Sequence, residues 1–272
     1  MMESKPLDFC LLIPCYDNFK GLLDSLATVR YHSDRFIVVI VDDGSKAPVT
    51  SASIKSGIKI DFPLVVLRNE VNRGITAALN AGLKWIEELG TANYVARLDC
   101  GDLCSQDRFY KQMDFMYSHA DVGLLGSWCV FEDTSNSSRY QYRTPTDHSQ
   151  IKRAMHFRNV FIHPTVVFKT SLLKQAGYYP NNFPHAEDYA FFFKLIKITN
   201  SHILGDFLVR CEINDRGISL KNRREQLISR ARVTNRYGTN PLLKIVGGIR
   251  TYALWLLPKR LVLLLRKWQA EQ

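Results

Sequence analysis

Two pairs of acidic residues stand where they could do chemistry. Asp99 and Asp102 follow an apolar run with a glycine between them, and Glu187 and Asp188 open a second apolar run about 85 residues later. Paired carboxylates can hold a hard divalent cation, and a single carboxylate can act as a general base. Taken alone, the first pair could equally be a solvated loop. The second could be the first turn of a helix, where acidic residues favour the helix dipole.

Strand-like and helix-like segments alternate at regular spacing around these pairs. Apolar, strand-like runs begin at Phe9, Phe36, Leu64 and Tyr94, with spacings of 27, 28 and 30 residues. Between the first two runs, residues 18–30 carry apolar side chains at helical spacing, and residues 75–89 do so between the last two. The 46–63 connection has no clear pattern. Such a rhythm predicts an α/β fold with a mostly parallel sheet covered by helices on both faces. Ligands of these sheets bind at the carboxyl ends of the strands.

Polar residues follow each of the four strand-like runs at its carboxyl end. The segments are Pro14-Cys15-Tyr16-Asp17, Asp42-Asp43-Gly44-Ser45, Arg68-Asn69 with Asn72-Arg73-Gly74, and Asp99-Cys100-Gly101-Asp102. A single segment such as DDGS is also a good turn or helix cap. Four together at one sheet edge favour a binding site over turns alone.

The second half of the chain is less regular. We expect strands at 122–130 and 165–169, a polar loop or lid over 132–150, a helix over 187–199 and a basic helix over 221–237. Six cysteines occur without a CxxC pair, and no signal peptide opens the chain, which favours reduced thiols and a cytoplasmic location.

The charge of the chain is uneven. Of its 272 residues, the last 53 carry twelve Lys or Arg and two Asp or Glu, so they hold all of the net charge of +10. A neutral body with a basic tail suggests an anionic partner for the tail, either a membrane surface or a nucleic acid.

The motifs LLIPCYD, VDDGS, NRGITAALNAG, ARLDCGD and HAEDYAFFFKL, in this order, resemble inverting glycosyltransferases of family 2. The resemblance covers about residues 8–220 and extends to members that build bacterial surface polysaccharides. It implies a GT-A fold with a catalytic domain over 1–220, a nucleotide-binding half over about 8–105 and an acceptor-binding half over about 106–220. Residues 221–272 would form a basic amphipathic helical tail.

The resemblance also implies roles for the residues. Pro14, Tyr16 and Asp17 would line the nucleotide pocket, and one of Asp42 and Asp43 would accept a hydrogen bond from the base. The further implied assignments are Arg73 near the base or diphosphate, Asp99 and Asp102 as the Mn²⁺ or Mg²⁺ site, Asp188 as the base and Glu187 as an orienting group.

One position departs from the commonest family motif, Asp-x-Asp-Asp. Gly101 stands in place of the third residue, which favours Asp102 for direct metal contact and leaves Asp99 for ribose or for metal through water. His163 could be a metal ligand, a diphosphate contact or a buried structural histidine.

Residues 242–268 are very apolar, yet their longest uncharged run is the eight residues from Thr251 to Pro258, too short to span a membrane. Leucines and tryptophans interleaved with basic residues suit an interfacial helix on anionic lipid, broken at Pro258. The alternative is packing on the catalytic domain or on a second subunit.

The function that the resemblance implies is metal-dependent, inverting transfer from a nucleoside diphosphate sugar, by default a UDP-sugar. The acceptor would be a saccharide, lipid-linked if the tail binds the inner face of the cytoplasmic membrane. Two alternatives are a nucleotidyltransferase that makes nucleotide sugars and a nucleic-acid-binding protein that acts through the basic tail. The neutral body, and the lack of a Gly-rich basic loop after the first strand, favour the glycosyltransferase.

Overall fold

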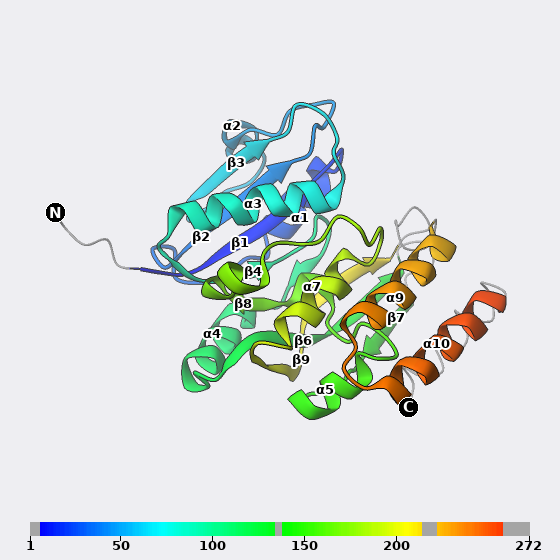
Figure 1. Cartoon of the computed structure of the whole chain (residues 1–272). Helices are drawn as coiled ribbons and strands as arrows, with labels where there is room; N and C mark the ends of the chain where they lie inside the picture. The colour runs from blue at the N-terminus through cyan, green and yellow to red at the C-terminus, as the bar shows by residue number, and fades with distance from the viewer. Residues whose placement is uncertain (1–5, 134–137, 214–221, 258–272) are drawn as a thin grey trace.

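The structure is a computed structural model that describes residues 6–133, 138–213 and 222–257. A mixed sheet of nine strands runs through it, with helices on both faces (Figure 1). The strand order is β3-β2-β1-β4-β8-β6-β9-β5. Strand β7 pairs with β6 and lies outside this order.

The first half of the chain has the expected alternation of strands and helices. Its elements are β1 (Leu7–Cys15), α1 (Phe19–Leu26), β2 (Phe36–Asp42), α2 (Ser51–Gly57), β3 (Leu64–Arg68), α3 (Ile75–Leu89), β4 (Ala92–Arg97), β5 (Leu103–Cys104) and α4 (Arg108–Ser118). Strands β3, β2, β1 and β4 are neighbours and all run parallel. Their carboxyl ends therefore meet at one edge of the sheet, as the sequence predicts. The unclear 46–63 connection contains α2, which begins with a capping box between Thr50 and Ser53.

The second half supplies mainly antiparallel strands. Its elements are β6 (Val122–Asp133), β7 (Ser138–Tyr142), α5 (His148–Ala154), η1 (His163–Thr165), β8 (Val167–Lys169), η2 (Thr170–Leu172), α6 (Leu173–Ala176), α7 (Glu187–Leu195), β9 (Asn200–Ile213), α9 (Arg223–Tyr237) and α10 (Pro241–Leu256). β8 joins the two halves by pairing antiparallel with both β4 and β6.

Two predictions for this half need correction. The 132–150 segment is not a simple loop, because β7 pairs antiparallel with β6 from Cys129↔Tyr142 to Asp133↔Ser138 and α5 begins at His148. The strand expected over 165–169 is shorter, because residues 163–165 form a 3₁₀ turn with Pro164 in its first turn.

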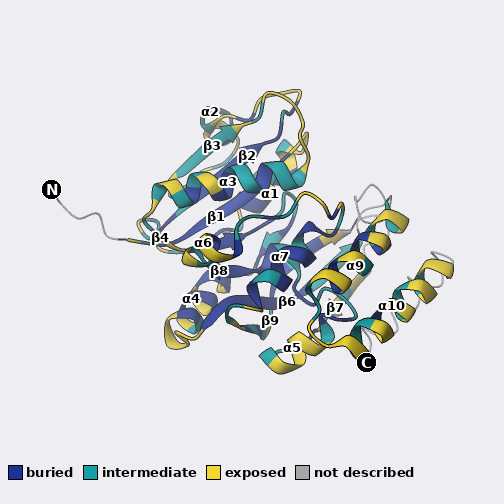
Figure 2. Ribbon diagram, viewed as in Figure 1, coloured by how far each residue is buried: buried dark blue, intermediate teal, exposed yellow. Residues whose placement is uncertain are grey.

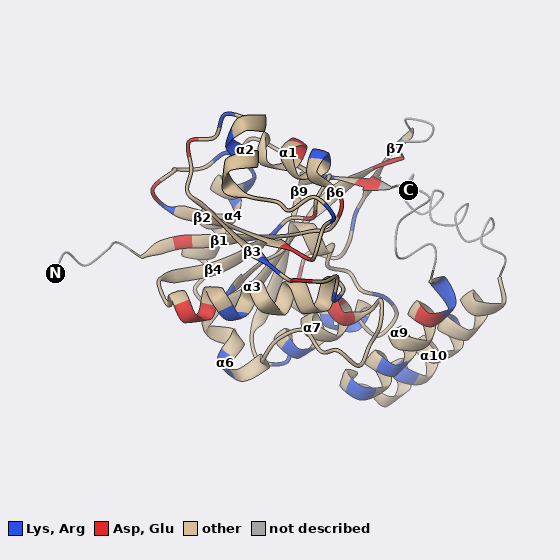
Figure 3. Cartoon of the chain, turned by 90° about the horizontal axis from the view of Figure 1, so that it is seen from above, with Lys and Arg blue, Asp and Glu red and all other residues tan. Residues whose placement is uncertain are grey.

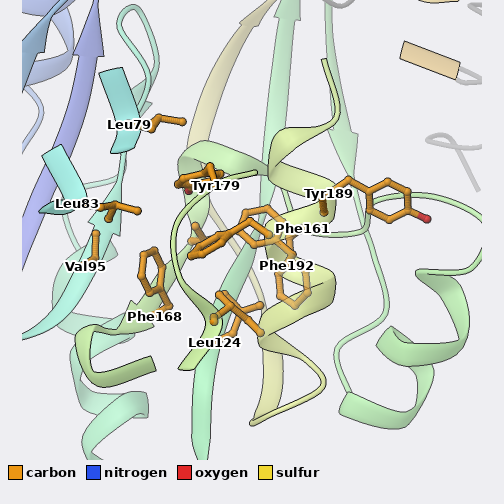
Figure 4. Packing of buried hydrophobic residues seen from close by; sticks show 14 of the residues in the cluster. Leu79, Leu83, Val95, Leu124, Phe161, Phe168, Tyr179, Tyr189 and Phe192 are labelled. Atoms are coloured by element: carbon orange, nitrogen blue, oxygen red, sulfur yellow. The ribbon is translucent and has the colours of Figure 1, made fainter. Parts of the chain in front are cut away.

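Two apolar clusters lie on the two faces of the sheet. One packs α3 and α7 against the strands, and nine of its members are labelled in Figure 4: Leu79, Leu83, Val95, Leu124, Phe161, Phe168, Tyr179, Tyr189 and Phe192. The other packs α1 and α4 against the opposite face. Burying a side chain such as Phe168 contributes about 2–3 kcal/mol, so this core fixes the frame on which the polar loops stand.

Candidate active site

The loops after β1 and β2 are tied together by hydrogen bonds. Asp43 N donates to Cys15 O (2.8 Å), and Asp17 N donates to Ser45 Oγ (2.9 Å). Lys46 N in turn donates to Asp17 Oδ1 (2.9 Å). Asp17 has a left-handed φ of +46°, which is unusual for a residue with a Cβ and is held here by these bonds. The carboxyl ends of β1 and β2 thus form one connected edge.

The two aspartates of DDGS both have structural partners. Asp42 is fully buried and accepts from Ser45 N (3.0 Å), Val49 N (3.1 Å) and the Arg68 guanidinium. These bonds lower the pKa of Asp42 against the opposing effect of burial, which is the largest single influence. Asp42 therefore acts as the turn residue that the motif also allowed, so any contact with a nucleobase would be an additional role.

Asp43 fixes the segment after β3. It is 3% exposed, and its oxygens accept from Asn69 Nδ2 (2.7 Å), Arg73 N (3.0 Å) and Gly74 N (2.8 Å). Only glycine fits at position 44, between the two loops. Its φ is +73°, and a Cβ there would lie 2.4 Å from the Val71 carbonyl carbon.

The remaining predicted nucleotide contacts lie along the same edge. Tyr16 is 46% exposed, the Arg73 side chain is exposed, and Pro14 is half-buried in β1 beside Val41. Exposed aromatic and guanidinium groups beside buried carboxylates can stack on a base or meet a phosphate. Their roles as nucleotide contacts stay predictions.

The Asp99 side chain forms an ion pair with a buried arginine. Arg97 is fully buried in β4 and donates to Asp99 Oδ1 at 2.6 Å and to the carbonyl oxygens of Leu12 and Leu98. Since the Asp99 side chain is 32% exposed, it keeps a face toward solvent.

His163 lies on the other side of this arginine. Arg97 Nε donates to His163 Nε2 (3.3 Å), and the Tyr179 hydroxyl lies 2.9 Å from the same nitrogen. Burial and the neighbouring Arg97 charge lower the pKa of His163 to about 3, so the ring is neutral at physiological pH. His163 therefore supports Arg97 and Tyr179, which matches the structural interpretation of this residue.

Asp102 is the more buried member of its pair. It is 7% exposed, and its Oδ1 accepts from Glu212 N at 3.0 Å. Burial, with the negative charges of Asp99 and Glu212, raises the pKa of Asp102 well above its usual range. The Glu212 carboxylate is close, because its Oε2 lies 3.1 Å from the place a Cβ would take on Gly101.

These residues fit a hard divalent cation. Oxygen ligands suit Mg²⁺ and Mn²⁺, and a cation would relieve the cost of keeping carboxylates close together in a buried place. Within the described residues no group of three or more His, Cys, Asp or Glu side chains is arranged to hold a metal ion. Phosphate oxygens or water would have to complete the coordination of an ion on Asp99 and Asp102.

The second acidic pair begins α7. Glu187 is 8% exposed, and burial together with Asp188 raises its pKa to about 7. Asp188 accepts from Tyr189 N (2.6 Å) and from Asn159 Nδ2 (2.9 Å). Burial, the largest influence, and the negative charge of Asp99 raise the pKa of Asp188 to about 6. A carboxylate with such a pKa can accept a proton near neutral pH.

The fold brings Asp99 of the first acidic pair near the second pair. Asp99 lies close enough to Glu187 and to Asp188 to raise the pKa of each, although about 85 residues separate them along the chain. The predicted nucleotide contacts occupy the β1, β2 and β3 part of the same edge. The site therefore combines the Asp99 and Asp102 carboxylates, whose oxygens suit a cation, with Glu187 and Asp188, whose raised pKa values suit proton transfer.

Several site residues were not found from the sequence. Arg97 had a signal, because a charged residue interrupts an otherwise apolar strand. Asn159, Tyr179 and Glu212 had none, because they reach the site from loops or strands distant in the chain.

Comparisons with known proteins identify the family and the fold of the chain. Residues 10–177 match the model of Glycosyl transferase family 2. The chain is 32% identical over 195 residues to the amylovoran biosynthesis glycosyltransferase AmsE of Erwinia amylovora, covering 70% of each chain. It is 33% identical over 163 residues to the UDP-Gal:alpha-D-GlcNAc-diphosphoundecaprenol beta-1,3-galactosyltransferase of Escherichia coli, covering 58% of this chain and 55% of that protein.

Solved structures share the fold at low sequence identity. Staphylococcus aureus TarS 1–349 in complex with UDP-GlcNAc superimposes with a TM-score of 0.65 at 20% identity, covering 89% of this chain and 70% of that one. The mannosyltransferase PcManGT from Pyrobaculum calidifontis, in complex with GDP-Man and Mn²⁺, gives 0.61 at 18% identity, covering 93% and 72%. The expected α/β fold and the family resemblance are confirmed, and the chain belongs to glycosyl transferase family 2.

Proposed function

We propose that the protein is an inverting, metal-dependent glycosyltransferase of bacterial surface polysaccharide biosynthesis. It would move a sugar from a nucleoside diphosphate sugar to a lipid-linked saccharide. The observation that carries this proposal is the closeness of Asp99, at the carboxyl edge of the parallel strands, to both Glu187 and Asp188. Relatives named for amylovoran and O-antigen biosynthesis support the pathway class.

The donor would lie along the β1–β4 edge, with its diphosphate toward Asp99 and Asp102. TarS binds UDP-GlcNAc, which supports a UDP-sugar as the default donor, and PcManGT binds GDP-Man with Mn²⁺. A bound Mn²⁺ or Mg²⁺ would neutralise the negative charge that grows on the diphosphate as the bond to the sugar breaks.

Asp188 would serve as the base. It would accept the proton of the acceptor hydroxyl as that oxygen attacks the sugar carbon from the face opposite the diphosphate, which inverts the configuration in one displacement. Tyr189 N donates to Oδ1 of Asp188 and Asn159 Nδ2 donates to Oδ2. Each carboxylate oxygen keeps a second lone pair that could accept the proton of the hydroxyl. Glu187, nearly buried beside it, would orient the acceptor or the base.

The proposal is tested by a thermal-shift screen of nucleotide sugars with and without Mn²⁺. A donor should raise the melting temperature of the wild type but not of Asp102→Ala. Transfer should then release free nucleoside diphosphate, whereas release of pyrophosphate, or no stabilisation by any nucleotide sugar, would contradict the proposal.

We also propose that α10 lies on a membrane surface. Figure 2 shows exposed residues along the length of α10, and its exposed large apolar residues are Leu242, Ile245, Val246, Ile249, Tyr252, Trp255 and Leu256. These positions recur every three or four residues and so form one stripe. Among the helices of the described residues, none has the length and hydropathy of a transmembrane span.

Charge favours anionic lipid as the partner of this stripe. The Arg224 guanidinium lies 5.6 Å from the Trp255 ring of the stripe, and Figure 3 shows further Lys and Arg positions along α9 and α10. Basic residues beside an inserted apolar face are typical of interfacial helices on anionic membranes. The other basic residues of the expected interfacial segment, from Lys259 on, lie outside the described residues.

Vesicle co-sedimentation tests this part separately. The full chain should bind vesicles of anionic phospholipid, and a chain that lacks residues 242–272 should not. A matched Ile245→Ser, Ile249→Ser double variant should bind much more weakly. Equal binding by the full and shortened chains would refute the membrane role.

A further inference from the structure

Two arginines from different helices of the C-terminal region meet at one backbone oxygen. Arg230 Nη2 of α9 and Arg250 Nη1 of α10 both donate to Phe157 O, at 3.5 and 3.1 Å. Both arginines are half-buried. Because the two guanidinium groups share one acceptor, they place two positive charges side by side at a fixed position.

The close packing of α10 fixes this position. Gly247 is buried in α10, and a Cβ there would lie only 2.2 Å from His156 O, so only glycine lets the helix approach this closely. His156 Nε2 also accepts from Thr239 N (3.1 Å) and Asn240 N (3.2 Å) in the turn between α9 and α10. Residues 156 and 157 therefore hold both helices, and with them both arginines.

The same short segment holds the proposed base. Asn159, which donates to Asp188, is two residues from Phe157, and two residues span at most about 7 Å. The positive charge of Arg230 also acts on Asp188 directly, since it lowers the pKa of that carboxyl against the dominant effect of burial. The arginine pair thus lies beside the place where the acceptor hydroxyl would react.

We propose that Arg230 and Arg250 bind the diphosphate of a polyprenyl diphosphate-linked saccharide, which is the acceptor. Guanidinium groups bind phosphate oxygens through paired hydrogen bonds, and two of them match the charge of a diphosphate. The inference rests on the proposed function and deepens it by naming the residues that would hold the diphosphate of the acceptor.

The geometry of α10 supports this assignment. One helix carries Arg250 on the side that faces the protein and the exposed apolar stripe on the outer side. The lipid chain of the acceptor would lie in the membrane beneath the stripe, and its diphosphate would lie at the arginines. The width of one helix would then separate the two parts of the acceptor. The closeness of Phe157 to Asn159 further fits an acceptor whose reacting hydroxyl belongs to the sugar that carries the diphosphate.

The test measures binding of farnesyl diphosphate, a short prenyl diphosphate, to the full chain by calorimetry. The donor site is first saturated with UDP, with MnCl₂ in excess over both diphosphates. We expect the wild type to bind farnesyl diphosphate without losing UDP. Arg230→Gln and Arg250→Gln should each weaken that binding at least tenfold, and Arg230→Lys should weaken it less. Arg232→Gln, an exposed arginine on the same helix, should bind like the wild type.

Each other outcome contradicts the inference. Displacement of UDP would mean that the probe occupies the donor site, and equal binding by the glutamine variants would mean that the arginines do not hold the diphosphate. Absence of binding by the wild type would also refute it. UDP binding by each variant verifies that the variant is folded. If none of the nucleoside diphosphates of the donor screen bound even the wild type, the proposed function itself would fail, and the inference with it.

Discussion

Removal of the Asn159 side chain should move the pH dependence of transfer. Asp188 has a pKa raised to about 6 by burial, and Asn159 Nδ2, 2.9 Å away, stabilises the charged form of this carboxyl. A hydrogen bond to a charged group contributes about 1.5–3 kcal/mol. At about 1.4 kcal/mol for each pKa unit, Asn159→Ala should raise the pKa of Asp188 to between about 7 and 8.

The sign of the effect follows from the role of Asp188. A base works only when it is deprotonated, so activity is present above its pKa and lost as the pH falls through it. At pH 7 about nine-tenths of the wild-type carboxyl is ionised. With a pKa near 7.5 about a quarter would be, a loss of about fourfold in rate that should disappear near pH 9.

The assay is kcat/KM for the acceptor, measured from pH 5 to pH 9. The acid limb of Asn159→Ala should lie one to two units above that of the wild type, and Asn235→Ala, an exposed asparagine on α9, should leave it unchanged. Because the negative charge of Asp188 raises the pKa of Glu187, the two carboxyls titrate together and the acid limb reports the pair. An unshifted acid limb in Asn159→Ala would refute the assignment of Asp188 as the base held by Asn159.

Three further outcomes are expected. Asp188→Asn should bind the nucleotide sugar like the wild type in a thermal-shift assay, yet lose about 10²–10⁴-fold in kcat; retained transfer would remove Asp188 from the base role. Asp102→Asn should bind Mn²⁺ at least tenfold more weakly by electron paramagnetic resonance, and unchanged affinity would leave Asp99 as the metal ligand. Gly247→Ala should destabilise the packing of α10 by about 1–3 kcal/mol and speed its amide hydrogen exchange, whereas the neighbouring Gly248→Ala, with open space at its Cβ, should not.

The sheet edge could be predicted because parallel strands impose simple rules. Continuous apolar runs at regular spacing predicted β1 to β4, and the carboxyl ends of parallel neighbours must lie together. The polar groups after these strands, from Asp17 to Asp102, were therefore placed at one edge without any knowledge of the second half. The helix that begins at Glu187 was predicted for the same kind of reason, since its pattern is local.

Long-range contacts could not be predicted in this way. Whether Asp42 is a turn residue or a ligand depends on Arg68 and Val49, and the neutral state of His163 depends on burial beside Arg97. The β7 hairpin was missed because its sequence is polar and its place in the sheet depends on pairing with β6.

The sequence by itself thus determined the α/β class, the family and the acidic pairs, because local periodicity and short motifs encode them. Only the tertiary structure decided that Asn159 holds Asp188, that Asp102 lies by Glu212, and that Arg230 and Arg250 meet at Phe157. It also decided that the apolar side of α10 faces outward. These arrangements depend on how segments distant in the chain pack on the sheet. The periodicity within a single segment does not predict that packing.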